Sequence, residues 1–379
     1  MILPNQRALF DVPDHVTYLN CAYMSPLMKS VTEAGKKGVT RKASPWEIGS
    51  GDFFTDSESL REVFARLIRC TAEDVAITAA VSYGISTAAR CLPVEKGQSI
   101  VVAQDQFPSN YYPWHERAKE VDAKVKRVPR PGDGDWTSAV LEALDDNTAI
   151  VALPHCHWAD GGLFDLRLIG EHCRNRGIYL VVDASQSLGI LPFSVQEVQP
   201  DFLAVPTYKW LLGPYSLGFL YVSKRWQDSL PIEHSWYHRR NAENFSALVD
   251  YEERFADGAR RFDVGERSNF ALLPMADAAI RQILDWGVEN IRDSVVAMTK
   301  RLADETSSLG LDSLPASLRA SHYLCLNLPE KAPADLPTHL AKDHVYVSIR
   351  GSSLRVTPHL YNTDQDVDRF LTALKKSLR

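Results

Sequence analysis

The stretch Ile178-Tyr-Leu-Val-Val-Asp183-Ala-Ser-Gln186-Ser-Leu-Gly189 decides how this chain is interpreted. An apolar run rich in Val and Leu that ends at Asp183 predicts a buried parallel strand with a carboxylate at its carboxyl end. The next apolar run, Asp201-Phe-Leu-Ala-Val205, ends four residues before Lys209. Ligands of open α/β sheets bind in the crevice outside the carboxyl ends of the strands. The two strands therefore present an acid and an amine to one crevice.

Each of these residues alone has an ordinary explanation. An aspartate after an apolar run often caps a helix or forms a turn, and a lysine beside a tryptophan is often solvated. The joint pattern of Asp183, Gln186, Lys209 and the following Gly213-Pro214 favours pyridoxal phosphate chemistry. In that chemistry a lysine amine forms a Schiff base, and an aspartate keeps the pyridine nitrogen protonated so that the ring withdraws electrons.

The same residues resemble the class V aminotransferase family of fold-type I pyridoxal phosphate enzymes, which includes cysteine desulfurases, kynureninases and isopenicillin-N-epimerase-like proteins. The resemblance covers nearly the whole chain. It implies an α/β fold with a mostly parallel seven-stranded sheet in a large domain (26–258) and a smaller α+β domain (259–379). It also implies that residues 1–25 pack with the smaller domain and that the active site lies at a homodimer interface.

Composition indicates an ordinary globular protein. The chain has 379 residues, 45% of them hydrophobic and 24% charged, with a net charge of -6. The net negative charge, without a basic run, argues against a nucleic-acid or anionic-membrane partner. The six cysteines have no metal or disulfide spacing, and no apolar run approaches the ~20 residues of a membrane span. We therefore expect a soluble cytoplasmic protein without a signal peptide.

Apolar runs alternate with helical stretches between residues 70 and 225, which predicts a mostly parallel sheet. The expected strands are Val75–Thr78, Ser99–Ala103, Ala123–Arg127, Ala149–Leu153, Tyr179–Val182, Phe202–Val205 and Gly218–Val222. Other expected elements are a strand at Val16–Leu19, helices at about 27–43, 272–286, 288–309 and 364–378, and short strands near 322–328, 345–349 and 353–357. The segment 226–258 shows no clear pattern.

A phosphate site is expected after the first strand of the sheet. The segment Ile77–Thr87 predicts a strand, a turn of small residues and a helix, whose first amides favour an anion. We expect Ser82 to cap this helix and donate to phosphate beside the amides of Tyr83 and Gly84, although a serine cap is often only structural. The resemblance places Tyr208 where many members carry a His or Tyr that contacts phosphate.

Three residues are expected around the cofactor ring. Gln186 suits a hydrogen bond to the phenolic oxygen. The resemblance assigns Phe107 to ring stacking, because kynureninase-like members carry Phe-Pro there, whereas a buried core phenylalanine is the alternative. Trp158 lies about where aminotransferase-like members carry an Asn, and its N–H is a donor.

The substrate is expected to meet Arg355. The segment Val347–Thr363 resembles the carboxyl-terminal signature of the family, whose arginine holds the substrate α-carboxylate through a planar fork. The alternative is an arginine paired with surface acids. Asn20 falls where the family lines the substrate pocket. His155 and His157 do not indicate a metal, because no further ligands have suitable spacing.

Two departures from the family pattern matter. Residues 326–379 contain no cysteine, so sulfur abstraction by the nucleophilic cysteine of desulfurases is not expected. Glu266 lies where many members have a Thr that reaches the phosphate of the neighbouring subunit. The candidates to replace that Thr are Arg267, Ser268 and Asn269.

The function expected from these observations is transamination of an amino acid or amine by a pyridoxal 5′-phosphate-dependent enzyme. Epimerisation and β-elimination remain alternatives within the family, because all three begin with loss of the α-proton. A catalytically inactive binding or regulatory protein with the same fold is an alternative of another class. The presence of both Lys209 and Asp183 argues against it.

Overall fold

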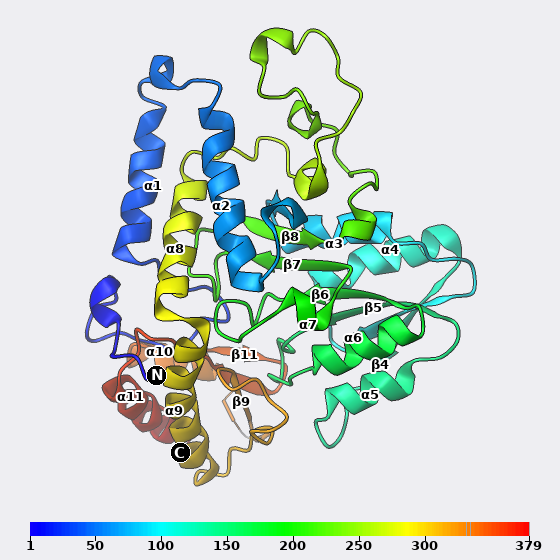
Figure 1. Cartoon of the computed structure of the whole chain (residues 1–379). Coiled ribbons are helices and arrows are strands. Elements are labelled where there is room, and N and C mark those ends of the chain that lie inside the picture. Colours follow the sequence, from blue (N-terminus) through cyan, green and yellow to red (C-terminus); the bar gives the residue numbers. More distant parts are fainter. Residues whose placement is uncertain (331, 334, 379) are drawn as a thin grey trace.

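A seven-stranded sheet forms the centre of the protein (Figure 1). The computed structural model describes residues 1–378 except 331 and 334. The strand order is β2-β8-β7-β6-β5-β3-β4, with β8 antiparallel to both neighbours. The strands are β2 (Val75–Thr78), β3 (Ser99–Ala103), β4 (Lys124–Val128), β5 (Thr148–Pro154), β6 (Tyr179–Asp183), β7 (Phe202–Pro206) and β8 (Gly218–Val222). The mostly parallel seven-stranded sheet predicted from the sequence is confirmed, with small differences at strand ends.

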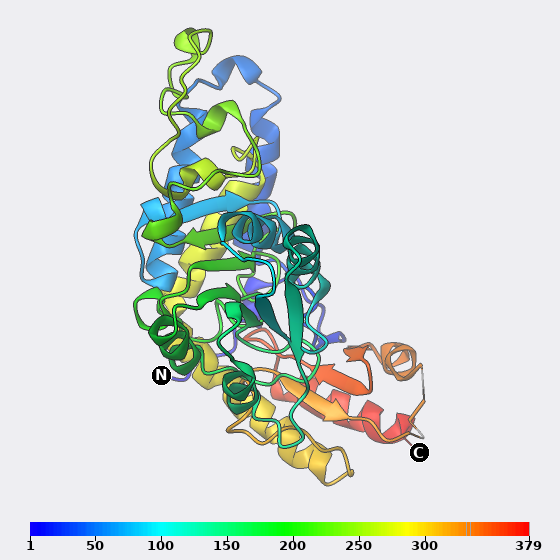
Figure 2. The same cartoon turned by 90° about the vertical axis from the view of Figure 1, so that its right-hand side faces the viewer.

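Both faces of the sheet are covered by helices, which is why its central strands are apolar throughout, whereas the edge strand β4 carries Lys124, Lys126 and Arg127. Successive side chains of a strand point to opposite faces. Ile150 and Ala152 of β5 therefore join the apolar cluster of α3 (Val81–Cys91) and α4 (Tyr112–Val121). The intervening Val151 and Leu153 join the cluster formed with α2 (Asp52–Ile68), α5 (Trp136–Ala143), α6 (Leu166–Asn175) and α8 (Leu272–Trp286) (Figure 2).

The C-terminal part has a sheet of its own, in the order β11-β12-β9, with antiparallel neighbours. Its strands are β9 (Leu324–Asn327), β11 (Ser348–Arg350) and β12 (Ser353–Val356), accompanied by α9 (Val288–Ser307), α10 (Leu336–Lys342) and α11 (Asp364–Ser377). Near the N-terminus, β1 (Thr17–Tyr18) pairs in parallel with β10 (Val345–Tyr346). This pairing supports the predicted packing of residues 1–25 with the C-terminal part. The domain boundaries themselves stay a prediction.

Helix α8 packs against α1 (Lys29–Arg41) and α2. The contact with α1 requires a glycine, because a Cβ on Gly38 would lie 2.0 Å from the carbonyl oxygen of Phe270. Any larger residue at position 38 would push α1 away from the start of α8.

The segment 226–258, which the sequence left unassigned, is irregular chain with short 3-10 turns. Two of them, Trp236–His238 and Phe245–Ala247, pack on α2 through Phe53 and Phe54. This segment and the loop between α1 and α2 project together at the top of Figure 1. We call residues 44–54 and 234–253 the projecting arm.

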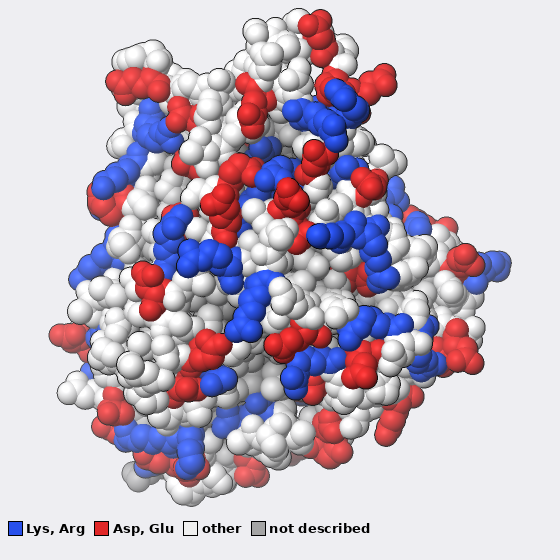
Figure 3. Space-filling view, viewed as in Figure 1, with Lys and Arg blue, Asp and Glu red and all other residues white. Residues whose placement is uncertain are grey.

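Acidic and basic side chains are interspersed over the face seen in Figure 3. Among the described residues, no helix combines the length and the apolar character that a membrane crossing needs.

Candidate active site

Asp183 and Lys209 lie at the carboxyl edge of the sheet, on neighbouring strands. Asp183 is the last residue of β6 and pairs in register with Ala204 of β7. Lys209 follows the end of β7 by three residues. Both side chains are buried, with Asp183 4% and Lys209 7% exposed. The structure therefore brings the predicted acid and amine together in one water-poor place.

Burial changes the protonation of both groups. Burial raises the pKa of Asp183, opposed by hydrogen bonds from Ser185 and by the charge of Lys209. Desolvation lowers the pKa of Lys209 to about 8, although Asp183 opposes this shift, and two arginines add to it. A lysine acts as a base only when its amine is neutral, so this lowering favours proton transfer near neutral pH.

A cavity of about 310 Å³ opens above Lys209. Six of the predicted site residues line it: Phe107, Trp158, Gln186, Tyr208, Lys209 and Arg355. Two tyrosines that the sequence analysis missed, Tyr23 and Tyr215, also line it, together with Arg350. Nothing in the local sequence distinguishes Tyr23 or Tyr215 from an ordinary loop tyrosine, since only the fold brings them to Lys209.

Aromatic rings surround the lysine amine. Lys209 Nζ lies 5.5 Å from the ring centroid of Phe107 and 5.4 Å from that of Tyr208. Phe107 meets Trp158 nearly at right angles, with 5.3 Å between ring centroids, and the rings of Tyr208 and Tyr215 lie 4.6 Å apart. Phe107 is thus a wall of the cavity and not a core phenylalanine. These rings limit access of water to the amine.

Gln186 lies at the cavity, but its side chain is already engaged. Its Nε2 donates to the carbonyl of Ala22 (3.1 Å), and its Oε1 accepts from Trp210 Nε1 (2.9 Å). The indole of Trp158 donates to the carbonyl of Asp105 (2.6 Å). Trp158 therefore offers the cavity a ring and not the free N–H expected from the sequence.

The predicted phosphate segment differs from expectation at its start. Helix α3 begins at Val81, one residue before Ser82, so the cap is Ala80, which has no side-chain hydrogen bond to the helix. The prediction that Ser82 caps this helix is therefore wrong. Ser82 is exposed and lines a separate hollow of about 590 Å³ between α3 and α4. The first amides of α3 still lack a capping side chain, which leaves them available to an anion.

Tyr83 and Gly84 do not line the cavity over Lys209. The hydroxyl of Tyr83 donates to Glu233 Oε2 (2.9 Å). A Cβ on Gly84 would lie 3.1 Å from Leu220 and 3.2 Å from Ala204, so this glycine allows α3 to pack closely on the sheet. The backbone amide of Gly84 donates to the carbonyl of Ala80 (3.3 Å), so of these two residues only Tyr83 keeps an amide as a possible phosphate ligand.

Arg355 is held by neutral partners alone. Its Nε and Nη2 donate to Ser348 Oγ (3.0 and 2.8 Å), and its Nη1 donates to Tyr323 and to the carbonyl of Trp158 (3.0 and 3.2 Å). Arg355 is 1% exposed, and no described acid lies within 4.0 Å of its guanidinium. A buried cation without a counter-charge is costly, so this arginine suits an anionic ligand.

Asn20 supports Arg355 and does not line the cavity. Its Oδ1 accepts a hydrogen bond from Ser348 Oγ (2.9 Å), the atom that accepts from Arg355. The expectation that Asn20 contacts substrate is thus replaced by an indirect role through Ser348. Ser348 was missed because a serine between apolar residues carries no local signal.

The three candidates for the missing Thr are engaged within this chain. Arg267 Nε lies 3.1 Å from Asp263 Oδ2, and Ser268 bonds to the hydroxyl of Tyr237. Asn269 accepts from two amides at the start of α8. Arg267 and Ser268 are buried, whereas Asn269 is exposed.

His157, one of the two histidines beside Cys156, is engaged by protein groups. Its Nε2 lies 3.0 Å from the carbonyl of Gln104, and its Nδ1 lies 3.1 Å from Asp160 Oδ1. Its ring stacks on Trp136. Burial lowers the pKa of His155 to about 4, so that ring stays neutral near neutral pH.

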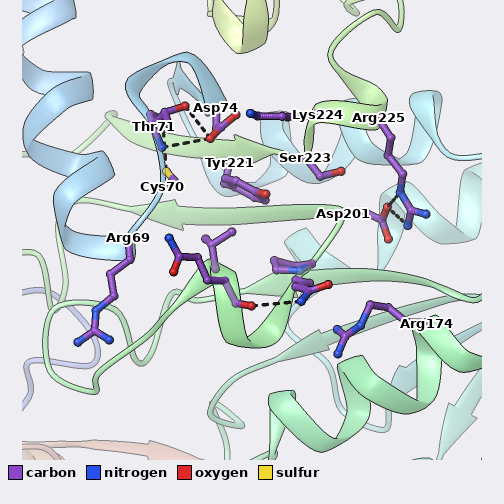
Figure 4. Close-up of a pocket in the computed structure, with 14 residues that line it drawn as sticks. Arg69, Cys70, Thr71, Asp74, Arg174, Asp201, Tyr221, Ser223, Lys224 and Arg225 are labelled. Carbon is purple, nitrogen blue, oxygen red and sulfur yellow. Dashed lines mark hydrogen bonds and ion pairs between the residues drawn. The ribbon is translucent and has the colours of Figure 1, made fainter.

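A larger cavity lies at the opposite, amino-terminal edge of the sheet. It has about 870 Å³ and is lined by residues such as Asp74, Asp201 and Arg225 (Figure 4). Its acids are already paired: Arg225 Nε donates to Asp201 (2.6 Å), and Thr71 donates to Asp74 (2.8 Å). It contains none of the predicted site residues, and we therefore place the candidate active site at the smaller cavity.

The chain belongs to the aminotransferase class-V family, whose model matches residues 47–370. It is 29% identical over 371 residues to the uncharacterized aminotransferase YcbU of Bacillus subtilis (strain 168), covering 96% of this chain and 95% of that protein. Its structure is similar to the apo structure of a cysteine desulfurase from Thermococcus onnurineus NA1, with a TM-score of 0.87, 21% identity and 99% coverage of both chains. It is also similar to a C-DES mutant with glycine covalently linked to the PLP cofactor, with a TM-score of 0.87, 19% identity and coverage of 97% and 98%.

Proposed function

We propose that this protein is a pyridoxal 5′-phosphate-dependent aminotransferase that acts on the α-carbon of an amino acid. The observation that carries the proposal is the pair of Asp183 and Lys209, buried side by side at the carboxyl edge of the sheet beneath an aromatic cavity. Membership of the aminotransferase class-V family supports it. So does the PLP cofactor, with glycine covalently linked to it, that is named for the C-DES mutant, as far as the fold is concerned.

The residues present fit this cofactor. Lys209 is the only lysine that lines the cavity within the described residues, and it would hold the aldehyde carbon. Asp183 would hold the pyridine nitrogen, because a buried carboxylate without an arginine partner needs a cationic neighbour. Phe107 would lie against the ring. The uncapped amides of α3, with Tyr208, would hold the phosphate.

When bound, pyridoxal phosphate supplies a conjugated ring that spreads the electron pair left at the substrate Cα. The chain contributes the rest. Arg355 orients the substrate through its carboxylate, and the aromatic wall excludes water from Cα. Lys209, with its pKa near 8, takes the proton from Cα. Asp183 holds a proton on the pyridine nitrogen through its negative charge.

The cysteines argue against a desulfurase reaction, although solved desulfurases share the fold. No cysteine follows Cys325 in the sequence. Cys325 is buried, its Sγ lies 3.4 Å from the carbonyl oxygen of Ala159, and burial raises its pKa. A thiol that stays protonated is a poor nucleophile.

The function is tested by incubating the loaded protein with single amino acids and a keto acid acceptor, and by identifying the products. A new amino acid formed from the acceptor supports transamination. An inverted enantiomer or released ammonia without acceptor conversion would instead indicate the epimerase or the β-lyase. If no amino acid alters the cofactor absorbance, the inactive binding protein is the better description.

Arg355→Lys is expected to weaken binding of α-carboxylates by roughly 2–3 kcal/mol, because it keeps the charge but loses the planar fork held by Ser348 and Tyr323. Titration of the cofactor absorbance with an amino acid and with the corresponding plain amine measures this. The amine should be affected far less than the amino acid. Equal losses for both ligands would show that Arg355 does not hold the carboxylate.

We further propose that the protein is a homodimer and that the projecting arm is covered by the second copy. On the arm Tyr251 is 94% and Val249 79% exposed, and Trp46 is exposed as well. Exposed apolar residues that gather in one place mark interaction sites.

Tyr251→Glu is expected to weaken self-association by about tenfold or more, the effect of losing one aromatic anchor. Sedimentation over a range of protein concentrations measures the dissociation constant. Leu168→Glu is the matched control, because Leu168 is exposed on α6, away from the arm. A wild-type protein that sediments as a monomer at every concentration would contradict the proposal.

A further inference from the structure

We infer that the substrate carries a second acidic group and that Arg350 binds it, so that the preferred substrates are dicarboxylic amino acids. The inference rests on the proposed function and names the substrate class of the same site. Its basis is that the cavity over Lys209 holds two arginines, Arg350 and Arg355, whereas an ordinary amino acid brings a single carboxylate.

The two arginines lie on one face of the β11–β12 hairpin. Ser348 of β11 is the direct cross-strand partner of Arg355, and Arg350 follows Ser348 by two residues. Side chains two residues apart on a strand point to the same face. Arg350 and Arg355 are therefore diagonal neighbours, about 7–8 Å apart at the backbone and within reach of one small ligand.

Neither arginine is neutralised by the protein. No described acid lies within 4.0 Å of Arg350 or Arg355, and no acidic side chain lines the cavity within the described residues. Partial burial lowers the pKa of Arg350, and the charge of Arg355 adds to this lowering. Two like charges held together in a poorly solvated space favour a ligand with two negative groups.

The two arginines differ in how firmly they are held, which assigns their roles. Arg355 is fully buried and is oriented by Ser348, Tyr323 and the carbonyl of Trp158. Arg350 is half-buried, and its only hydrogen bond within the described residues goes from Nη1 to the carbonyl of Ile349 (2.7 Å). The rigid arginine suits the invariant α-carboxylate. The adjustable one, whose guanidinium lies 5.9 Å from the ring centroid of Trp158, suits the end of a side chain.

The test compares isosteric pairs of amino acids, L-glutamate with L-glutamine and L-aspartate with L-asparagine, in the loaded enzyme. We expect the acidic member of at least one pair to have a kcat/KM about tenfold or more above its amide, the effect of one charge-assisted contact. Arg350→Gln should remove this preference by lowering kcat/KM for the acid alone. Lys224→Gln, which removes an exposed charge at the opposite edge of the sheet, should leave the preference unchanged.

A second measurement uses the protein without cofactor and no turnover. Calorimetry with glutarate and with its monoamide should show tighter binding of glutarate, by about tenfold, and Arg350→Gln should equalise the two. The inference is overturned if glutarate and its monoamide bind alike and if Arg350→Gln changes neither their affinities nor the preference for acidic amino acids. In that case, transamination of neutral amino acids would still support the proposed function. If no amino acid reacts but glutarate binding depends on Arg350, the proposed function fails and the dianion site stands.

Discussion

Replacing Lys209 by alanine is expected to abolish the visible absorbance band of the bound cofactor. It should also lower turnover by roughly 10²–10⁴-fold or more, which is the contribution of a positioned proton-transfer group. Lys209 is the only amine lining the cavity within the described residues, so no neighbouring side chain can replace it. Absorbance spectra of the purified variant, and mass spectrometry of the wild-type protein after borohydride reduction, measure these effects. The reduced adduct should lie on the peptide that contains Tyr208 and Lys209.

The variant should remain folded, which separates lost chemistry from lost structure. Desolvation lowers the pKa of Lys209, so the folded state disfavours its charged form. The pKa of Lys209 is lower in the folded protein than in the unfolded chain. Below pH 8 the charged lysine therefore lowers the free energy of unfolding. Lys209→Ala should melt no lower than expected for a small cavity. Lys224→Ala, at an exposed lysine, is the control and should keep both the band and the activity. A reduced adduct on any other lysine would overturn the assignment.

Asp183→Asn is expected to keep the cofactor bound but to lower kcat by about 10²–10³-fold, the effect of one electrostatic group in a water-excluded site. The buried carboxylate at the end of β6 is placed to hold a proton on the pyridine nitrogen. The isosteric amide fills the same volume but lacks the negative charge. Steady-state kinetics, together with cofactor content from absorbance, measures the two effects separately.

Asp201 offers a matched control on the neighbouring strand. It is also a buried aspartate, but it lies at the opposite end of β7, where it accepts from the amide of Leu180 (2.8 Å) and from Arg225. Asp201→Asn should lower the melting temperature and leave kcat nearly unchanged. Asp183→Asn should instead lower kcat and raise the melting temperature. The reason for the second effect is that burial raises the pKa of Asp183, so its negative charge is costly to the fold. A nearly normal kcat in Asp183→Asn would reduce this aspartate to a structural role.

The sequence by itself determined the strands and the two central residues of the site. Strands buried on both faces are continuous apolar runs, which is why the central strands, including β6 and β7, are visible in the sequence. Because parallel strands align their carboxyl ends, Asp183 and Lys209 fell at one edge without knowledge of the strand order. Phe107, Tyr208 and Arg355 followed from the resemblance to the family and line the same cavity.

Only the tertiary structure decided which polar groups are free. Gln186 and Trp158 were expected to offer hydrogen bonds to the ring. In the structure the side chain of Gln186 is bonded to Trp210 and Ala22, and the indole N–H of Trp158 is bonded to Asp105. Helix α3 began one residue before its expected serine cap, a difference that local propensity is too weak to settle.

The placement of the arginines depends on the fold for the same reason. Arg355 meets the carbonyl of Trp158 across 197 positions of sequence and across the domain boundary that we predict, and Ser348, which accepts from Arg355, bonds to Asn20 at a distance of 328 positions. A pattern of neighbouring residues reports which side chains are buried, because burial repeats with the period of a helix or strand. It does not report which distant group satisfies a buried hydrogen bond or charge, since those partners meet only when the chain packs.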